Sequence, residues 1–312
     1  MRGKLLLFLC SFLFPFQVLA YDFEINGIFY NKKFEGVEVT CQFKNEGNQS
    51  TYSGYVVIPD TVVYEGKRYP VTSIDNYAFY NCGALDSIFI PNTVVNIGYD
   101  AFRKCINLVS VILPKRIKEI SMFCFENCSK LSSVIIPNGV SRICHNAFWG
   151  CINLQEIEIP SSVKVIESDA FKICGLISIE IPDSIVCINE STFAFCESLI
   201  SVKIPPSVTK ICKNAFHNCS SLSYLYVQIQ NPKSCNVENA FSYSMYESSY
   251  LNRIKLCVSH GNSEVFKETL PWKKCKEIEE FDYDEFNAFI SPKIVKQKKN
   301  RTRSAKLQFK RQ

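Results

Sequence analysis

Apolar residues recur along this chain with a period of about 23 residues. Residues 147–160 read Ala-Phe-Trp-Gly-Cys-Ile-Asn-Leu-Gln-Glu-Ile-Glu-Ile-Pro, which gives the skeleton Ala-Phe-x-x-Cys-x-x-Leu-x-x-aliphatic-x-aliphatic-Pro. The steps between successive skeleton phenylalanines are 23, 23, 23, 23, 22 and 23 residues, and the residues are Phe79, Phe102, Phe125, Phe148, Phe171, Phe193 and Phe216. A fixed period of this length predicts a repeat solenoid, in which each coil buries its apolar side chains against its neighbours.

Within one unit, the spacing predicts the local elements. Residues 157–159 alternate inward and outward as in a short strand, and Pro160 ends that strand. The next apolar residues, Val163, Ile166 and Phe171, are three to five positions apart, which predicts an extended piece followed by one helical or 3-10 turn. Stacked copies are therefore expected to form a parallel sheet of short strands.

The flanks of the array follow other patterns. Residues 21–73 have period-two alternation, and Asn26-Gly27 predicts a type I′ hairpin turn. We interpret 21–73 as an N-terminal β cap on a solenoid of about seven repeats over 74–227, and 228–281, where the register fades, as a C-terminal cap. Residues 282–312, acidic and then basic, have no hydrophobic periodicity and are predicted to be a disordered tail.

The skeleton resembles the BspA-like, Treponema-type leucine-rich repeats, whose consensus is Leu-x-x-Ile-x-Ile-Pro-x-Ser-Val-x-x-Ile-Gly-x-x-Ala-Phe-x-x-Cys-x-x. Residues 85–105 show this pattern, and the resemblance covers about 71–227. It implies a leucine-rich-repeat fold of short parallel strands, and roles in adhesion and host interaction. The sequence departs from the consensus at Cys124 and Thr192, which replace alanine, and at 174–176, where one residue is missing. That deletion is expected to kink one coil without ending the stack.

The N-terminus predicts export. Arg2 and Lys4 precede an apolar run over 5–16 and a short-residue segment ending at Ala20, which is the pattern of a secretory signal peptide cleaved after Ala20. Cys10 lacks the small preceding residue expected before a lipidated cysteine, so a lipid anchor is disfavoured. The sequence offers no transmembrane segment, and we expect a secreted or cell-surface protein.

The net charge of +5 reflects the tail rather than a basic binding face. Nine of the 35 lysines and arginines lie within 293–311, and the body of the chain is mildly acidic. Such a tail could hold anionic glycan, lipid headgroups or nucleic acid, or it could be a structural extension that is solvated or folds back onto the acidic segment at 277–285. The second interpretation is favoured, and no nucleic-acid partner is expected.

Sixteen cysteines in an exported chain raise the question of disulfides. We interpret the seven at the repeat position as a ladder of buried thiols, because in-register Cβ atoms ~4.8 Å apart exceed the ~3.8 Å that a disulfide prefers. These are Cys82, Cys105, Cys128, Cys151, Cys174, Cys196 and Cys219. Cys144 and Cys212 share another position but lie three coils apart. The better disulfide candidates are Cys235, Cys257 and Cys275.

Catalytic and metal-binding patterns are weak in this sequence. No paired Cys-x-x-Cys motif predicts zinc, and the adjacent Cys144 and His145 are expected to point apart. The chain has three histidines and neither a glycine-rich phosphate loop nor a Gly-x-Ser-x-Gly elbow. We therefore expect no enzymatic activity, catalytic residue, cofactor or metal.

The outward strand positions are the candidate ligand-binding site. They are Phe89, Ile112, Ile135, Glu158, Glu180, Lys203 and Tyr226. The first three form an apolar stripe that a solvated sheet does not require, although a cap, a neighbouring chain or tolerated strand-forming residues would also account for it. The sequence thus predicts an exported, non-enzymatic adhesion protein that recognises extracellular protein or glycan. A structural or envelope-assembly component without a dedicated ligand is the first alternative, and an enzyme with an unrecognised site is the second.

Overall fold

The described part of the N-terminal segment consists of six strands. The computed structural model describes residues 20–42, 52–242 and 250–281. The strands of this segment are β1 (Phe23–Ile25), β2 (Ile28–Lys33), β3 (Gly36–Thr40), β4 (Gly54–Val57), β5 (Thr61–Tyr64) and β6 (Lys67–Ile74). The β1–β2 hairpin turns at Asn26 and Gly27, whose φ angles of 52° and 76° confirm the predicted left-handed pair. Glu65 and Gly66 make the corresponding turn between β5 and β6.

This segment is joined to the first coils by strand pairing. Its sheet has the order β1-β2-β3-β6-β5, and β6 also pairs in parallel with β8 (Asn96–Ile97). Strand β4 leaves that sheet and pairs in parallel with β7 (Leu85–Phe89). Parallel strand pairing therefore connects this segment to the first coils of the solenoid.

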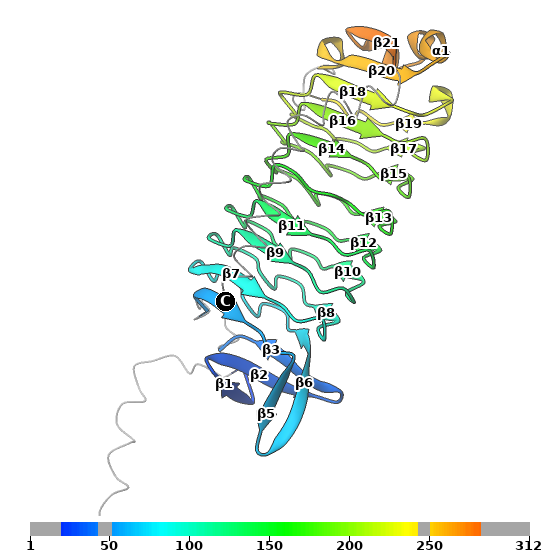
Figure 1. Cartoon of the computed structure of the whole chain (residues 1–312). Coiled ribbons are helices and arrows are strands. Elements are labelled where there is room, and N and C mark those ends of the chain that lie inside the picture. The colour runs from blue at the N-terminus through cyan, green and yellow to red at the C-terminus, as the bar shows by residue number, and fades with distance from the viewer. Residues whose placement is uncertain (1–19, 43–51, 243–249, 282–312) are drawn as a thin grey trace, which may run out of the picture.

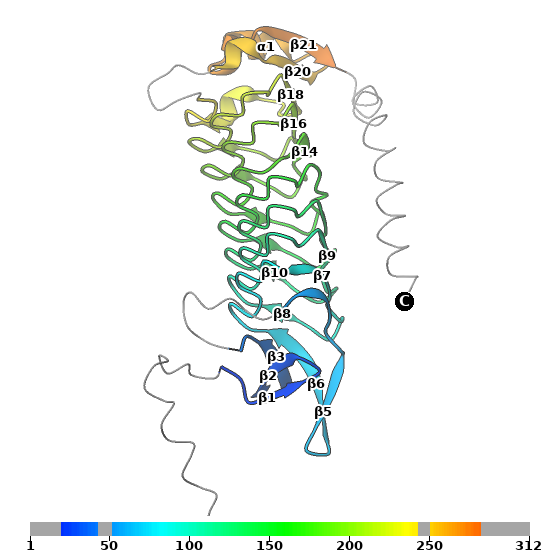
Figure 2. The same cartoon turned by 90° about the vertical axis from the view of Figure 1, so that its left-hand side faces the viewer.

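The repeats form an elongated stack of coils with two rows of strands (Figure 1). The row with the longer strands contains β7, β9 (Ser110–Ile112), β11 (Ser133–Ile135), β14 (Ser178–Glu180), β16 (Ser201–Ile204) and β18 (Tyr224–Val227). The second row contains two-residue strands: β8, β10 (Glu119–Ile120), β12 (Arg142–Ile143), β13 (Val165–Ile166), β15 (Cys187–Ile188), β17 (Lys210–Ile211) and β19 (Asn236–Val237). Figure 2 shows the longer strands along one edge of the stack and the turns along the opposite edge.

Among the described residues, strand pairing is interrupted in both rows at two places: between β7 and β9 and between β8 and β10, and again between the fifth and sixth coils. The predicted strand at 157–159 is wrong: these residues form no strand, although Ile159 is buried and Glu158 exposed as alternation requires. Strand β14 pairs with β16, and β15 pairs with β17, so the described ladders restart there in both rows. The second interruption coincides with the shortened turn, where the backbone at Gly175 comes so close to Ile152 that an added Cβ would lie 2.1 Å from the Ile152 carbonyl oxygen.

Side chains and single backbone contacts hold the stack together across this interruption. The Asn189 side-chain amide donates to the Ile166 carbonyl over 2.6 Å, and the Ile177 N–H donates to the Gln155 carbonyl over 3.0 Å. The core also continues, with Phe148 and Phe171 stacked at 5.3 Å. The stack therefore continues past the deletion, and the expected kink of one coil stays a prediction.

The turn side of each coil is built from two tight turns, not from the helical or 3-10 turn that the spacing predicts. We number the coils by their repeat phenylalanine, starting with Phe79. In the first coil, Tyr80 N–H donates to Tyr77 O and Cys82 N–H donates to Phe79 O. Residues two before and two after the repeat phenylalanine have φ near +55° to +75°, as at Tyr77 and Asn81. A left-handed residue every four positions breaks the run of right-handed dihedrals that a helix needs.

The core is a column of parallel rings. Eight phenylalanines from Phe79 to Phe241 stack in sequence, with centroids 5.0–5.6 Å apart and ring planes within 9° of each other. Inward aliphatic residues of both strand rows pack around this column, and all eight rings are buried. The column is why a coil gains its stability from its neighbours.

The repeat geometry persists beyond Gln228, where the sequence pattern fades. Strands β20 (Lys255–Ser259) and β21 (Glu277–Phe281) extend the sheet in the order β14-β16-β18-β20-β21, with Leu225 opposite Leu256 and Leu256 opposite Ile278. The connections hold η1 (Pro232–Ser234), η2 (Tyr250–Arg253), α1 (Ser263–Glu268) and η3 (Trp272–Lys274). The connections vary in length and structure, so the repeat period is not visible in the sequence. The strands nevertheless continue the sheet in register.

Candidate functional site: the sheet face

The outward residues of the longer strands line up along the stack. Register places Val57 beside Phe89, Ile112 beside Ile135, and Glu180 beside Lys203. Lys203 in turn lies beside Tyr226, and Tyr226 beside Cys257. We call this line, from Val57 to Cys257, the outward row. It contains all seven residues predicted as ligand-binding.

The N-terminal half of the outward row is an exposed apolar stripe. Phe89, Ile112 and Ile135 are 42%, 43% and 48% exposed, although each follows a fully or almost fully buried neighbour in its strand. Val57 extends the stripe and is 49% exposed. Strand pairing fixes Val57 beside Phe89 and Ile112 beside Ile135, and it holds these side chains with little freedom to withdraw from water.

Sequence reasoning missed Val57 and its neighbour Tyr55. Residues 56–59 read Val-Val-Ile-Pro and match the aliphatic-x-aliphatic-Pro signal of residues 88–91, but they precede it by 32 residues instead of 23. The β5–β6 hairpin accounts for the additional residues between them. A search for this motif alone, without the requirement of a 23-residue period, would have identified β4 as a member of the sheet.

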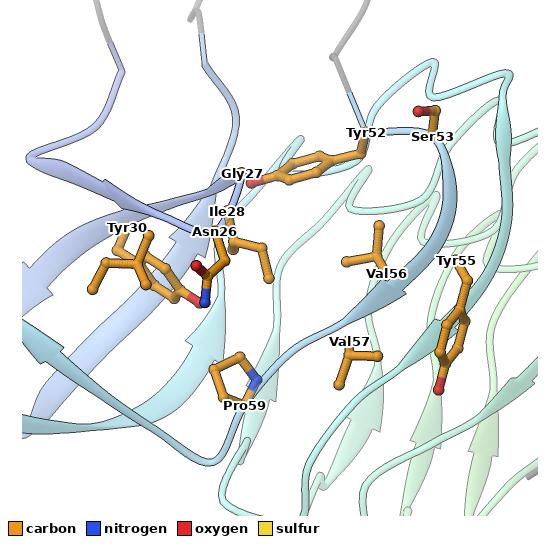
Figure 3. Close-up of a pocket in the computed structure, with 11 residues that line it drawn as sticks. Asn26, Gly27, Ile28, Tyr30, Tyr52, Ser53, Tyr55, Val56, Val57 and Pro59 are labelled. Carbon is orange, nitrogen blue, oxygen red and sulfur yellow. The ribbon is translucent and has the colours of Figure 1, made fainter. Parts of the chain in front are cut away.

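The stripe ends at a hollow between the β1–β2 hairpin and β4 (Figure 3). The hollow has a volume of about 600 Å³, and its lining includes Asn26, Ile28, Tyr30, Tyr52, Tyr55 and Val57. The Tyr52 hydroxyl donates to Thr40 O over 2.7 Å and accepts from Phe29 N–H, which fixes this wall. Because Tyr55 and Val57 line both features, the hollow is continuous with the stripe.

The C-terminal part of the outward row is covered, which corrects two predicted exposed positions. Lys203 is 5% exposed and Tyr226 is 6% exposed. Tyr226 packs edge-on against Phe281 at 5.1 Å, and burial raises the pKa of its hydroxyl to about 12. Lys203 forms an ion pair with Glu180. Both side chains are therefore held by their own chain.

Glu158 and Glu180 separate the apolar and the covered parts of the outward row. Both carboxylates are exposed, and Glu180 neutralises the buried Lys203 ammonium group. The outward row thus changes along its length from apolar to acidic and then to buried. A ligand has access to the apolar stripe and the acidic positions, from Val57 to Glu180.

The repeat cysteines are buried thiols with a defined hydrogen-bonding role. From Cys105 to Cys219, each Sγ donates to the carbonyl of the repeat phenylalanine one coil earlier, over 3.0–3.2 Å. No disulfide joins the cysteines of the described residues, including the candidates Cys235, Cys257 and Cys275. Burial raises the pKa of the Cys196 thiol to about 12, which keeps it protonated and unreactive.

The histidines lie at structural contacts in the turns. His145 packs edge-on against Phe123, and its Nδ1 lies 2.9 Å from the Ser168 carbonyl. His217 packs against Phe195 in the same way, with Nδ1 2.7 Å from the Ser242 hydroxyl. Across the described ranges, no three His, Cys, Asp or Glu side chains are grouped as metal ligands. Within those ranges no helix has the length and apolar character to cross a bilayer.

Comparison with known proteins agrees with this geometry. The family described as BspA type leucine rich repeat region matches in six copies, over residues 72–179, 118–248 and 164–299. A leucine-rich repeat protein from Bacteroides ovatus of known structure is 25% identical, with a TM-score of 0.59 over 84% of this chain and 77% of that one. The leucine-rich repeat protein of T. pallidum is 24% identical, with a TM-score of 0.41 over 66% of this chain and 84% of that one. No curated protein matches the chain.

Proposed function

Because this chain belongs to the BspA type leucine-rich repeat family, we propose that it is an exported, non-enzymatic binding protein that holds an extracellular partner on its sheet face. The observation that carries the proposal is the apolar stripe of Val57, Phe89, Ile112 and Ile135. Each of these side chains is more than 40% exposed, whereas the apolar residues directly before and after it in the sequence are buried. Contiguous exposed apolar residues of this kind mark contact surfaces.

The chemistry of the stripe favours a protein partner over a glycan. Val57, Ile112 and Ile135 are branched aliphatic residues, whose desolvation requires apolar side chains from the partner. A sugar ring stacks better on flat aromatic faces, and Phe89 and Tyr55 offer two of these at the N-terminal end of the stripe. Glu158 and Glu180 add negative charge beside the stripe, so a partner with basic residues next to an apolar segment fits both parts.

The proposal is tested with purified protein against a panel of extracellular matrix proteins and a glycan array. We expect at least one binder whose Kd rises tenfold or more in the double variant Phe89→Ser plus Ile135→Ser, because about 1.4 kcal/mol of contact energy is tenfold in affinity. The matched control is Ile152→Ser, a 56% exposed isoleucine outside the outward row. Binding that survives the double variant, or that falls equally with the control, would place the site elsewhere.

The same assay separates the protein and glycan readings. Retention on the protein panel that depends on Ile135 supports the apolar contact, whereas retention on the glycan array that depends on Tyr55 and Phe89 supports ring stacking. If folded protein binds neither panel, the structural or envelope-assembly reading takes precedence.

A further inference from the structure

Two cysteines outside the thiol ladder lie in contact on the surface of adjacent coils. Cys187 begins β15, Cys212 directly follows β17, and their Sγ atoms are 3.5 Å apart. Both side chains are partly exposed, in contrast to the ladder thiols. Sequence spacing did not reveal the pair because the two cysteines occupy different positions of the repeat.

Strand register explains why these positions meet. Ile188 is paired with Ile211, so Cys187 precedes and Cys212 follows a paired residue, which places them diagonally across the two strands. The same diagonal two coils earlier holds the ion pair between Arg142 and Glu167, at 2.7 Å. The strand register therefore brings the side chains at these two positions into contact. In the sixth and seventh coils, both of them are thiols.

We propose that Cys187 and Cys212 are the site of an intramolecular disulfide that fastens two consecutive coils when the protein meets a low-molecular-weight disulfide oxidant. The two sulfurs must approach from 3.5 Å to about 2.05 Å, a shift within the reach of two surface side chains at the end of short strands. The other half-exposed cysteine of the described residues, Cys275, lies in the last connection before β21.

The exchange balances with oxidised glutathione as the oxidant. The thiolate of one cysteine attacks a glutathione sulfur, forms a mixed disulfide and expels one glutathione thiolate. The thiolate of the second cysteine then attacks the protein sulfur of that mixed disulfide and expels the other glutathione thiolate. In sum, two protein thiols and one glutathione disulfide become one protein disulfide and two glutathione thiols, which take up the two protons.

The local environment sets the conditions for this exchange. Burial, followed by the contact with Cys187, raises the pKa of the Cys212 thiol to about 11, while the nearby Lys210 ammonium opposes that shift. Lys210 is itself paired with Glu238 over 3.1 Å. The thiolate is therefore scarce at neutral pH, and the reaction is best followed at pH 8.5 or above.

The link would stabilise the C-terminal half of the stack. It closes a loop between the sixth and seventh coils, immediately after the second interruption in both strand rows. Cross-linking a loop of this length restricts the unfolded chain, and we expect the melting temperature to rise by about 5 to 10 °C. The gain should appear on oxidation and disappear on reduction.

Peptide mapping tests the proposal directly. Reduced protein is incubated with oxidised glutathione at pH 8.5, blocked with N-ethylmaleimide, and digested with trypsin and a glutamate-specific protease. Residues 181–190 then carry Cys187 as their single cysteine, and residues 211–213 carry Cys212. We expect these two peptides to be recovered joined by a disulfide. Their recovery as separate glutathione adducts, as alkylated thiols, or bridged to other cysteines would overturn the proposal.

Variants provide the matched controls. Cys187→Ser and Cys212→Ser should each abolish the joined peptide and the rise in melting temperature on oxidation. Cys275→Ser changes the third half-exposed thiol and should leave both results intact. A rise in melting temperature that persists in Cys187→Ser would assign the stabilising link to other cysteines. The wild-type peptide map decides the question even if a serine variant folds poorly.

Discussion

At the scale of single residues, the repeat phenylalanine and the repeat cysteine act together. Each phenylalanine ring stacks on the rings of the adjacent coils, and its carbonyl oxygen accepts the thiol of the next coil. That carbonyl oxygen also accepts the backbone N–H of the cysteine in its own unit, as Phe125 O does from Cys128 N–H over 3.1 Å, so the thiol is a second donor to it. The cysteine side chain is small and apolar and also provides a hydrogen-bond donor, whereas alanine and valine side chains provide none.

Phe148 tests the ring column. Its side chain is fully buried between Phe125 and Phe171, at centroid distances of 5.4 and 5.3 Å. Phe148→Ala leaves a cavity in a middle coil, and we expect it to lower the free energy of unfolding by about 3–5 kcal/mol, measured by urea denaturation. Phe34→Ala is the control, because Phe34 is fully exposed and its removal should leave the midpoint unchanged. Equal midpoints for both variants would contradict the column.

At the scale of the element, the shortened turn lies directly against the backbone of the preceding coil. Gly175 lies against the Ile152 carbonyl, with no room for a side chain. Gly83 occupies the corresponding place after the cysteine of the first unit, and a Cβ there would meet Ile106 at an ordinary 3.6 Å. One missing residue thus replaces a loose contact by a backbone-to-backbone contact.

This difference gives a matched pair of substitutions. Gly175→Ala forces the backbones of two coils apart, and we expect a loss of stability of roughly 1–3 kcal/mol or more, as for other overpacked sites. Gly83→Ala should be neutral or slightly stabilising, because alanine restricts the unfolded chain. Urea midpoints of the two variants make the comparison. Equal effects would show that the shortened turn adjusts freely.

A comparison of the strands and turns with the repeat spacing shows which features could be predicted from the sequence. The 23-residue spacing predicted the buried repeat phenylalanines, the inward aliphatic residues and the parallel strands, because each depends on positions within one unit or its neighbour. It did not predict the missing strand at 157–159, which depends on how close the following coil approaches. The burial of Tyr226 by Phe281 depends on a strand 55 residues downstream, and the period fades before that strand. The assignment of 21–73 and 228–281 as caps, and the tail beyond 281, remain predictions.

At the scale of the whole molecule, the buried thiols couple stability to alkaline pH. Burial raises the pKa of Cys105, Cys124, Cys151, Cys174 and Cys219 well above 9.0, and that of Cys196 to about 12. Above pH 9 the unfolded chain releases these protons while the folded chain keeps them, so stability falls as pH rises. The contribution of the protonated, buried thiols to stability is fully present below pH 9 and decreases towards pH 12.

We expect a steep, reversible loss of stability over this range. At pH 10 each such thiol costs roughly 1.4 kcal/mol, so six of them remove several kcal/mol. Urea midpoints measured from pH 7 to 10.5 under reducing conditions test this expectation. Cys196→Ala should reduce the slope above pH 9, while substitution of an exposed lysine such as Lys164 should not. A flat profile would mean that the ladder thiols are accessible to solvent.

The ladder of thiols and carbonyls also has a consequence for how such a chain can change its length. Every interior coil offers a thiol to the coil before it and a carbonyl to the coil after it, and the last carbonyl in the described series, that of Phe216, is met by the Tyr250 hydroxyl instead. Duplication or loss of one whole 23-residue unit leaves each donor opposite an acceptor and the terminal tyrosine on the final rung. The one-residue deletion at 174–176 also leaves the Cys174 and Cys196 thiols on their phenylalanine carbonyls, both over 3.1 Å, because it lies in the turn that follows the cysteine. Unequal recombination between repeats can therefore lengthen or shorten the binding face by whole rungs, and the terminal tyrosine fits whichever coil has become the last.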